Sequence, residues 1–153
     1  MVAILHNVRS LFNVGSIFRT ADAVGLEKLY LCGLTPTPYD IFGTLRSQLA
    51  KVSLGAEKTV AWEKQTSIVK TILKLKDEGY KIAAIELAKN SMPYFNFKAP
   101  TKTALIVGHE VKGLPKNILA LADVVLEIPM RGLKESLNVG VAFGVVAFCL
   151  TQK

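Results

Sequence analysis

Short apolar runs recur along the chain, and most are bounded by polar residues, glycine or proline. Runs of four or five residues are too short for helices, and apolar character throughout a run is typical of strands buried on both faces of a sheet. The pattern predicts strands at residues 2–5, 29–32, 59–62, 81–85, 103–107 and 124–128.

Helical patterns fill most of the gaps between these strands. Asn13 is a suitable N-cap and Gly25 a suitable end for a helix over 14–24, and residues 65–78 place Ile68, Ile72 and Leu75 on one apolar face. A short helix to residue 121 and an apolar helix after residue 136 complete the set. Alternating strands and helices predict an α/β domain with a parallel sheet covered on both faces.

Two segments give weaker signals. The proline-rich stretch 34–39 reads as a loop, and residues 40–57 have little periodicity, so we interpret them as a surface excursion around a short helix. Residues 86–102 are predicted to form an open loop.

Polar residues gather after three of the predicted strands. Ligands of open α/β sheets bind outside the carboxyl ends of the strands, so the loops after Leu5, Val107 and Ile128 should converge. They bring glycines together with a small set of polar candidates: Asn13, Arg19, Glu110, Ser136 and Asn138. For Asn13 and Ser136, simple helix capping is the competing interpretation.

Several chemistries lack their usual residues. The chain has no GxGxxG fingerprint and no GxxxxGK[ST] loop, which argues against hydride transfer and nucleoside triphosphate hydrolysis. Neither His6 nor His109 adjoins a nucleophile, and a lone loop histidine is more often solvated than catalytic. Cys32 and Cys149 lie in apolar contexts without CxxC spacing, so we expect reduced thiols and no metal site.

The composition of the chain indicates what kind of partner it binds. The 153 residues are 50% hydrophobic, enough for one buried core, and the net charge of +7 favours a polyanionic partner. The first residues carry no charged leader and no run is long enough to span a membrane, so we expect a soluble, cytoplasmic protein. Basic residues in loops or at element ends are candidates for contact with that partner: Arg9, Arg46, Lys51, Lys112, Arg131 and Lys134.

Three segments carry a family resemblance. Residues 13–21 (NVGSIFRTA), 105–114 (LIVGHEVKGL) and 128–132 with 136–139 (IPMRG and SLNV) resemble, in order, the three motifs of the SpoU (TrmH-like) RNA ribose methyltransferases of the SPOUT superfamily. Residues 51–56 (KVSLGA) are similar to a further segment of that family. The resemblance spans nearly the whole chain, which we interpret as a single SpoU-type domain over 1–153 without an appended RNA-binding domain.

The resemblance implies a deep C-terminal trefoil knot, a homodimer, S-adenosylmethionine (SAM) as cofactor and no metal. It assigns catalytic and pocket-forming roles to Asn13, Arg19, Glu110, Ser136 and Asn138. It assigns cofactor contacts to Leu105, Val107, Gly108, Gly113, Ile128, Pro129, Met130 and Leu137. Two positions depart from the family pattern, His109 in place of serine or asparagine and Gly140 in place of serine.

The implied reaction is methyl transfer to a ribose 2′-hydroxyl of tRNA or ribosomal RNA. Family accounts make Arg19 the base, but a guanidinium keeps its proton in proteins and so suits an electrostatic role, with Glu110 orienting it towards an RNA phosphate or the alkoxide. Two alternatives remain: a catalytically inactive RNA-binding relative of the same fold, and an unrelated small-molecule α/β enzyme.

Overall fold

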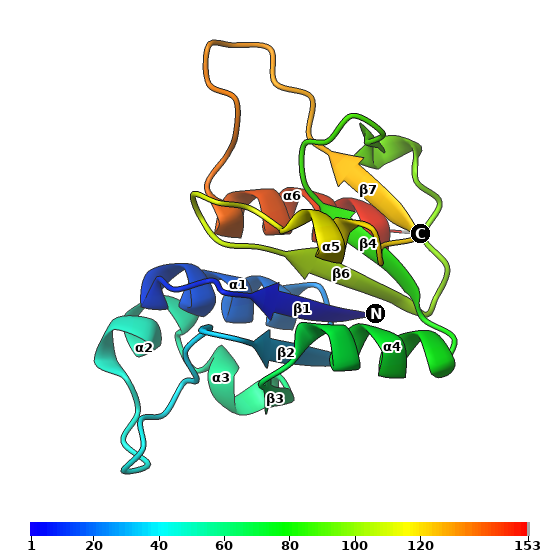
Figure 1. The fold of residues 1–153 in the computed structure, drawn as a ribbon. Coiled ribbons are helices and arrows are strands. Elements are labelled where there is room, and N and C mark those ends of the chain that lie inside the picture. The colour runs from blue at the N-terminus through cyan, green and yellow to red at the C-terminus, as the bar shows by residue number, and fades with distance from the viewer. Residues whose placement is uncertain (153) are drawn as a thin grey trace.

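Seven parallel strands form one sheet in the order β3-β2-β1-β6-β4-β7-β5 in the computed structural model, which describes residues 1–152 (Figure 1). The strands are β1 (Val2–His6), β2 (Lys28–Cys32), β3 (Trp62–Gln65), β4 (Lys81–Ile85), β5 (Met92–Pro93), β6 (Thr103–Val107) and β7 (Val124–Glu127). The helices are α1 (Leu11–Ala23), α2 (Ser47–Ser53), α3 (Ala56–Thr59), α4 (Ile68–Asp77), α5 (Lys116–Leu119) and α6 (Val139–Thr151), with a 3₁₀ helix η1 (Tyr94–Asn96). This confirms the predicted fold class.

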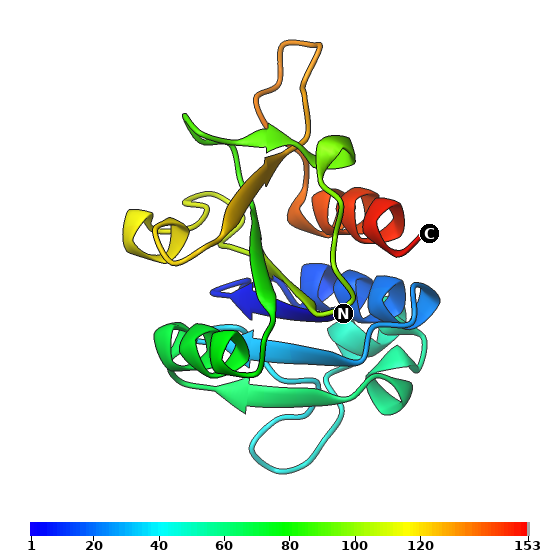
Figure 2. The same cartoon turned by 90° about the vertical axis from the view of Figure 1, so that its right-hand side faces the viewer.

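Helices cover both faces of the sheet. Figure 2 shows α1, α2, α3 and α6 on one side and α4 and α5 on the other. Because successive strand residues point to opposite faces, Ala3 and Leu5 of β1 join the core beneath α1 and α6, while Val2 and Ile4 join the core beneath α4 and α5. Burial on both faces explains why the strands are apolar throughout.

The strand order reverses between β1 and β6. The chain runs outward from β1 through β2 to β3, and its later strands β4, β6 and β7 lie on the other side of β1. The register pairs Leu5 with Val107, so the segments after β1 and β6 start side by side at the carboxyl edge of the sheet. A reversal of this kind opens the crevice in which α/β sheets bind ligands.

The close approach of α1 to α2 depends on Gly15. Gly15 is buried, and a Cβ at this position would lie 2.7 Å from the Leu49 carbonyl oxygen and 3.2 Å from the Val52 Cβ. Backbone atoms cannot move aside as a flexible side chain can, so any side chain at position 15 separates the two helices.

Gly15→Ala should therefore destabilise the fold. We expect a loss of about 1–3 kcal/mol in the free energy of unfolding, the range for overpacked cores, measured by urea denaturation. Gly144→Ala in α6 is the matched control, because its Cβ would meet only the Thr20 side chain at 3.8 Å. Equal stability of the two variants would contradict this account of the α1–α2 contact.

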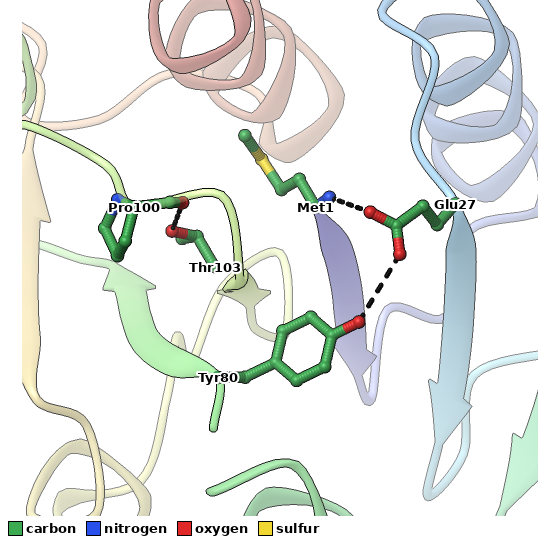
Figure 3. A network of polar contacts seen from close by, with 5 residues as sticks. All are labelled: Met1, Glu27, Tyr80, Pro100 and Thr103. Carbon is green, nitrogen blue, oxygen red and sulfur yellow. Dashed lines mark hydrogen bonds and ion pairs between the residues drawn. The ribbon is translucent and has the colours of Figure 1, made fainter. Parts of the chain in front are cut away.

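A polar network ties together the amino ends of the central strands (Figure 3). The amino group of Met1 donates to Glu27 Oε1, and the Tyr80 hydroxyl donates to Glu27 Oε2 at 3.4 Å. The hydrogen bond from the Met1 amino group is the main cause of the lowered pKa of Glu27. In the same region the Thr103 hydroxyl donates to the Pro100 carbonyl oxygen at 2.6 Å, where the chain enters β6. These contacts lie at the opposite edge of the sheet from the crevice.

Several predicted boundaries were wrong. The first helix begins at Leu11 and is capped by the Ser10 hydroxyl, not by Asn13. The third strand is residues 62–65 rather than 59–62, because α3 occupies residues 56–59. The segment 40–57 is more than a surface excursion, since Leu49, Ser53 and Glu57 are buried. In the predicted open loop, a two-residue strand and a 3₁₀ helix form at residues 92–96.

Both cysteines are free thiols. Burial raises the pKa of Cys32 to about 11, so this thiol stays protonated at neutral pH. Among residues 1–152 no helix is long and apolar enough to cross a membrane. The trefoil knot stays a prediction.

Candidate active site

A cleft opens at the carboxyl edge of the sheet where four segments meet. These are the end of β4, the β6–α5 loop (108–115), the end of β7, and the β7–α6 loop (128–138), the extended orange loop of Figure 1. The lining residues are Ile85, Glu86, Leu87, Val107, Gly108, His109, Glu110, Val111, Lys112, Gly113, Leu126, Ile128, Met130, Glu135, Ser136, Leu137, Val139 and Ala142.

Glu110 joins this cleft to the start of α1. Its Oε1 accepts hydrogen bonds from the Ser10 backbone N–H at 2.9 Å and from the Asn13 side-chain amide at 3.2 Å, and its Oε2 accepts from the Arg9 N–H at 3.2 Å. One carboxylate thereby accepts two backbone N–H groups and one side-chain amide at the N-terminus of α1, where negative charge is favourable. The predicted convergence of the loops after β1 and β6 is confirmed.

The side-chain amides of Asn13 and Asn138 form a directed chain. Glu110 can only accept, so the NH2 of Asn13 faces Glu110 and its Oδ1 accepts from Asn138 Nδ2 at 3.0 Å. The Asn138 Oδ1 in turn accepts from the backbone N–H of Gly140 and Val141. Each amide orientation is therefore fixed by its partners, and each NH2 group keeps one N–H without a partner among residues 1–152.

The start of α6 differs from the sequence-based expectation. Asn138, not Ser136, is its N-cap, and Ser136 lies two residues earlier in the exposed β7–α6 loop on the wall of the cleft. Both residues precede a helical pattern and both types are common caps, so the sequence could not choose between them. The Ser136 hydroxyl forms no hydrogen bond with the described residues.

Glu110 and His109 of the β6–α5 loop are both engaged as hydrogen-bond acceptors. Partial burial raises the pKa of Glu110, but the hydrogen bonds from the backbone of Ser10 and Glu110, the Asn13 amide and the Arg9 backbone outweigh it, so the net pKa is lowered. His109 Nδ1 accepts from the N–H groups of Val111 and Lys112 at 3.0 and 3.2 Å. Its remaining ring proton therefore sits on Nε2, which leaves no nitrogen lone pair to act as a base.

Most of the predicted cofactor residues line the cleft, namely Val107, Gly108, Gly113, Ile128, Met130 and Leu137. Leu105 does not, because it is fully buried in the core beneath α1 and α6. Pro129 lines an adjoining hollow, which shares Leu87, Ile128, Met130 and Glu135 with the cleft.

Arg19 lies apart from the other catalytic candidates. It is exposed on α1, six residues and about 9 Å along the helix axis from Asn13, and forms no ion pair with any described residue. The expectation that Glu110 orients Arg19 is therefore not met within one chain, because Glu110 is occupied by the helix N-terminus.

The predicted RNA contacts occupy the surface. Arg9, Lys51, Lys112, Arg131 and Lys134 are exposed, and Arg46 is half-buried with its Nε donating to the Thr37 carbonyl oxygen at 3.1 Å. None of these six cations forms an ion pair within residues 1–152.

Sequence reasoning missed the wall formed by the end of β4. Ile85, Glu86 and Leu87 line the cleft because β4 lies between β6 and β7, a neighbour relation that chain order does not reveal. One signal was available: Glu86 is a carboxylate directly after an apolar strand. No group of three or more histidine, cysteine or acidic residues within 1–152 could hold a metal ion.

Comparison with known proteins identifies the family. The family model described as SpoU rRNA Methylase matches residues 1–148. The chain belongs to the SpoU methylase family. The residues matched include all three motifs and the whole cleft.

Its relatives include RNA methyltransferases. The chain is 32% identical over 148 residues to the tRNA (guanosine(18)-2′-O)-methyltransferase of Aquifex aeolicus, covering 97% of this chain and 67% of that protein. It is 34% identical over 152 residues to a putative TrmH family tRNA/rRNA methyltransferase of Staphylococcus aureus, covering 99% of this chain and 58% of that protein. An AdoMet-bound rRNA methyltransferase structure from Sinorhizobium meliloti superposes with a TM-score of 0.86 at 25% identity, over 97% of this chain and 54% of the other.

Both departures from the SpoU pattern have local explanations. His109 folds back on its own loop through Nδ1, a capping contact that a serine or asparagine oxygen also makes. Gly140 packs against α1, where a Cβ would lie 3.1 Å from the Ser16 hydroxyl and 3.2 Å from Asn138 Oδ1. Glycine therefore lets the start of α6 approach α1 closely.

Proposed function

We propose that this SpoU protein transfers the methyl group of SAM to a ribose 2′-hydroxyl of RNA. The observation that carries the proposal is the hydrogen-bonded chain from Glu110 through Asn13 to Asn138, which places oriented amide donors next to lining residues of the cleft. The names of the Aquifex and Staphylococcus relatives support an RNA substrate, and the Sinorhizobium structure supports the cofactor.

The cleft has the chemistry that SAM requires. Apolar side chains of Val107, Leu126 and Ile128 on the wall of the cleft suit the flat adenine. Three lining carboxylates, Glu86, Glu110 and Glu135, favour a cationic ligand, which matches a sulfonium and an ammonium group. When bound, SAM supplies a methyl group that is already activated by the positive sulfur.

The residues of the chain have to make a ribose hydroxyl nucleophilic. Because Glu110 and His109 are engaged as acceptors, the site offers donors rather than a free base. The spare N–H groups of Asn13 and Asn138 and the Ser136 hydroxyl can hold the ribose oxygen and stabilise negative charge on it as its proton leaves to water. Preorganised donors of this kind need no rearrangement during the reaction.

RNA would be held by the exposed cations around the cleft. Arg131 and Lys134 project on the β7–α6 loop, and Lys112 lies on the β6–α5 loop, so cations flank the opening on two sides. Phosphate contacts by these groups give affinity that is insensitive to base sequence and falls steeply with salt.

A homodimer is the proposed assembly. Phe12 at the start of α1 is 53% exposed, and Val141 and Phe148 on α6 are 52% and 43% exposed, so two packed helices display large apolar side chains to solvent. Such exposure is typical of a surface that another chain covers. Sedimentation equilibrium at twice the mass of the chain would support it, and a monomer across the micromolar range would contradict it.

The deciding experiment is transfer of labelled methyl from SAM to separate pools of unmodified tRNA and ribosomal RNA, followed by nucleoside analysis. We expect label in a 2′-O-methyl nucleoside, and the labelled pool identifies the RNA class. Binding of SAM and RNA without transfer in either pool would favour the inactive-relative alternative. Failure to bind SAM would contradict the proposed function. An affinity for RNA that does not fall as the salt concentration rises would argue against phosphate contacts and favour the small-molecule alternative.

A further inference from the structure

Glu86 is a carboxylate of the cleft that takes no part in the proposed methyl-transfer step. It follows β4 directly, and its backbone N–H donates to the Leu126 carbonyl oxygen of β7 at 3.0 Å, which fixes the direction of its side chain. The register pairs Ala84 with Ile106, so Glu86 stands beside Gly108 at the start of the β6–α5 loop. The side chain lines the cleft.

The carboxylate holds the far end of that loop. Glu86 Oε2 accepts the Leu114 N–H at 2.9 Å, and Oε1 accepts the Leu87 N–H at 3.0 Å. Gly113 makes this approach possible, because it has a φ of +64° and a Cβ there would overlap Glu86 Oε2. The two ends of the β6–α5 loop, Gly108 and Leu114, are thereby fixed relative to β4.

Glu86 still has unused capacity to accept hydrogen bonds. A carboxylate has about four lone-pair sites, and only two are occupied by the N–H groups of Leu87 and Leu114. Glu86 forms no ion pair with any described residue. The remaining acceptor sites of this half-buried carboxylate face the cleft, and a pair of adjacent hydroxyl groups can donate to both of its oxygens.

We infer that Glu86 accepts the ribose hydroxyls of the nucleoside cofactor while holding the β6–α5 loop closed against it. The inference rests on the proposed function. A carboxylate one strand away from a glycine-containing, ligand-holding loop is also how dinucleotide-binding sheets recognise ribose. Here β4 adjoins β6, and the loop after β6 carries Gly108 and Gly113. The same residue thus recognises the ligand and fixes the wall against which it binds.

The test is a binding cycle by isothermal titration calorimetry. The ligands are S-adenosylhomocysteine, its 2′-deoxy and 3′-deoxy counterparts, and 5′-methylthioadenosine, which has the ribose but no amino acid. In the wild type we expect about a 10-fold loss of affinity on removing the hydroxyl that Glu86 accepts, and in Glu86→Ala about a 10–100-fold loss for the parent ligand. In Glu86→Ala, removing that hydroxyl from the ligand should lower the affinity by a further factor of less than about 3.

Other variants separate recognition from folding. Glu86→Gln keeps an oxygen for the Leu114 N–H and should bind with intermediate affinity at an unchanged melting temperature. Asp77→Ala on α4 removes an exposed carboxylate that forms no hydrogen bond or ion pair with the described residues and should bind like the wild type. The inference would be overturned if removing each ribose hydroxyl in turn still cost Glu86→Ala as much affinity as it costs the wild type. It would also be overturned if Glu86→Ala bound 5′-methylthioadenosine with unchanged affinity, because Glu86 would then contact the ammonium group of the amino acid moiety instead. Wild-type protein that fails to bind any of these ligands would instead contradict the proposed function.

Discussion

Glu110→Ala should sharply reduce methyl transfer and destabilise the fold. The substitution leaves the N–H groups of Arg9 and Ser10 and the amide of Asn13 without their acceptor, at the N-terminus of α1. Loss of hydrogen bonds to a charged acceptor should lower the free energy of unfolding by about 2 kcal/mol. Without Glu110, the Asn13 amide is held only by its hydrogen bond from Asn138 Nδ2, so the spare donors are less firmly oriented and turnover should fall by about 10²–10³.

The measurement combines urea denaturation with the labelled-methyl assay. Asp77→Ala is the charge-matched control, because it removes an exposed carboxylate of α4 far from the cleft, and it should match the wild type in both assays. Full activity in a destabilised Glu110→Ala protein would show that Glu110 serves folding alone. Glu110→Gln keeps one acceptor oxygen and should lie between the two.

The stability contributed by Glu110 should depend on pH. Its pKa is lowered in the folded protein from an unfolded value near 4.5, so its contribution is complete above about pH 4.5 and is lost as the pH falls through the folded pKa. The difference in unfolding free energy between wild type and Glu110→Gln should therefore be constant near neutral pH and shrink in acid. A constant difference down to pH 3 would contradict this.

The strands were predictable because burial on both faces leaves a signal that depends only on local sequence. The structure has β4 at residues 81–85 and β6 at residues 103–107, as predicted. The strand predicted at 59–62 failed, because its Thr-Val-Ala-Trp pattern fits the end of α3 as well as a strand, and tertiary packing decides between them. Short apolar runs carry this ambiguity in general.

The site was predictable in its residues but not in its contacts. Asn13, Glu110 and Asn138 do come together. The residue pattern alone does not reveal that Ser10 caps α1 and so frees the Asn13 side chain for Glu110. Likewise, a cap at Asn138 leaves Ser136 on the wall of the cleft. Capping depends on φ and ψ, which residue type constrains only weakly. Glu86 was missed because strand neighbours are set by topology.

Arg19→Ala should reduce methyl transfer by at least about 10²-fold while SAM binding survives. The guanidinium is exposed and forms no ion pair with any described residue, so its five donors are available to an RNA phosphate or to the ribose oxygen. Arg19 does not line the cleft, so its removal leaves the walls that we assign to the cofactor intact. Calorimetry with S-adenosylhomocysteine should give the wild-type affinity, and the labelled-methyl assay should give little product.

Two further variants separate a base from an electrostatic clamp. Arg19→Lys keeps the charge but loses the planar fork, so a clamp should retain partial activity whose Michaelis constant for RNA rises with salt. A base would instead give a rate that increases with pH up to the pKa of the new lysine, near 10. Lys70→Ala on the exposed side of α4 removes a positive charge without touching α1 and is the control for net charge. Near-normal turnover in Arg19→Ala would remove Arg19 from the reaction, and the donors of Asn13, Ser136 and Asn138 would then have to stabilise the alkoxide alone.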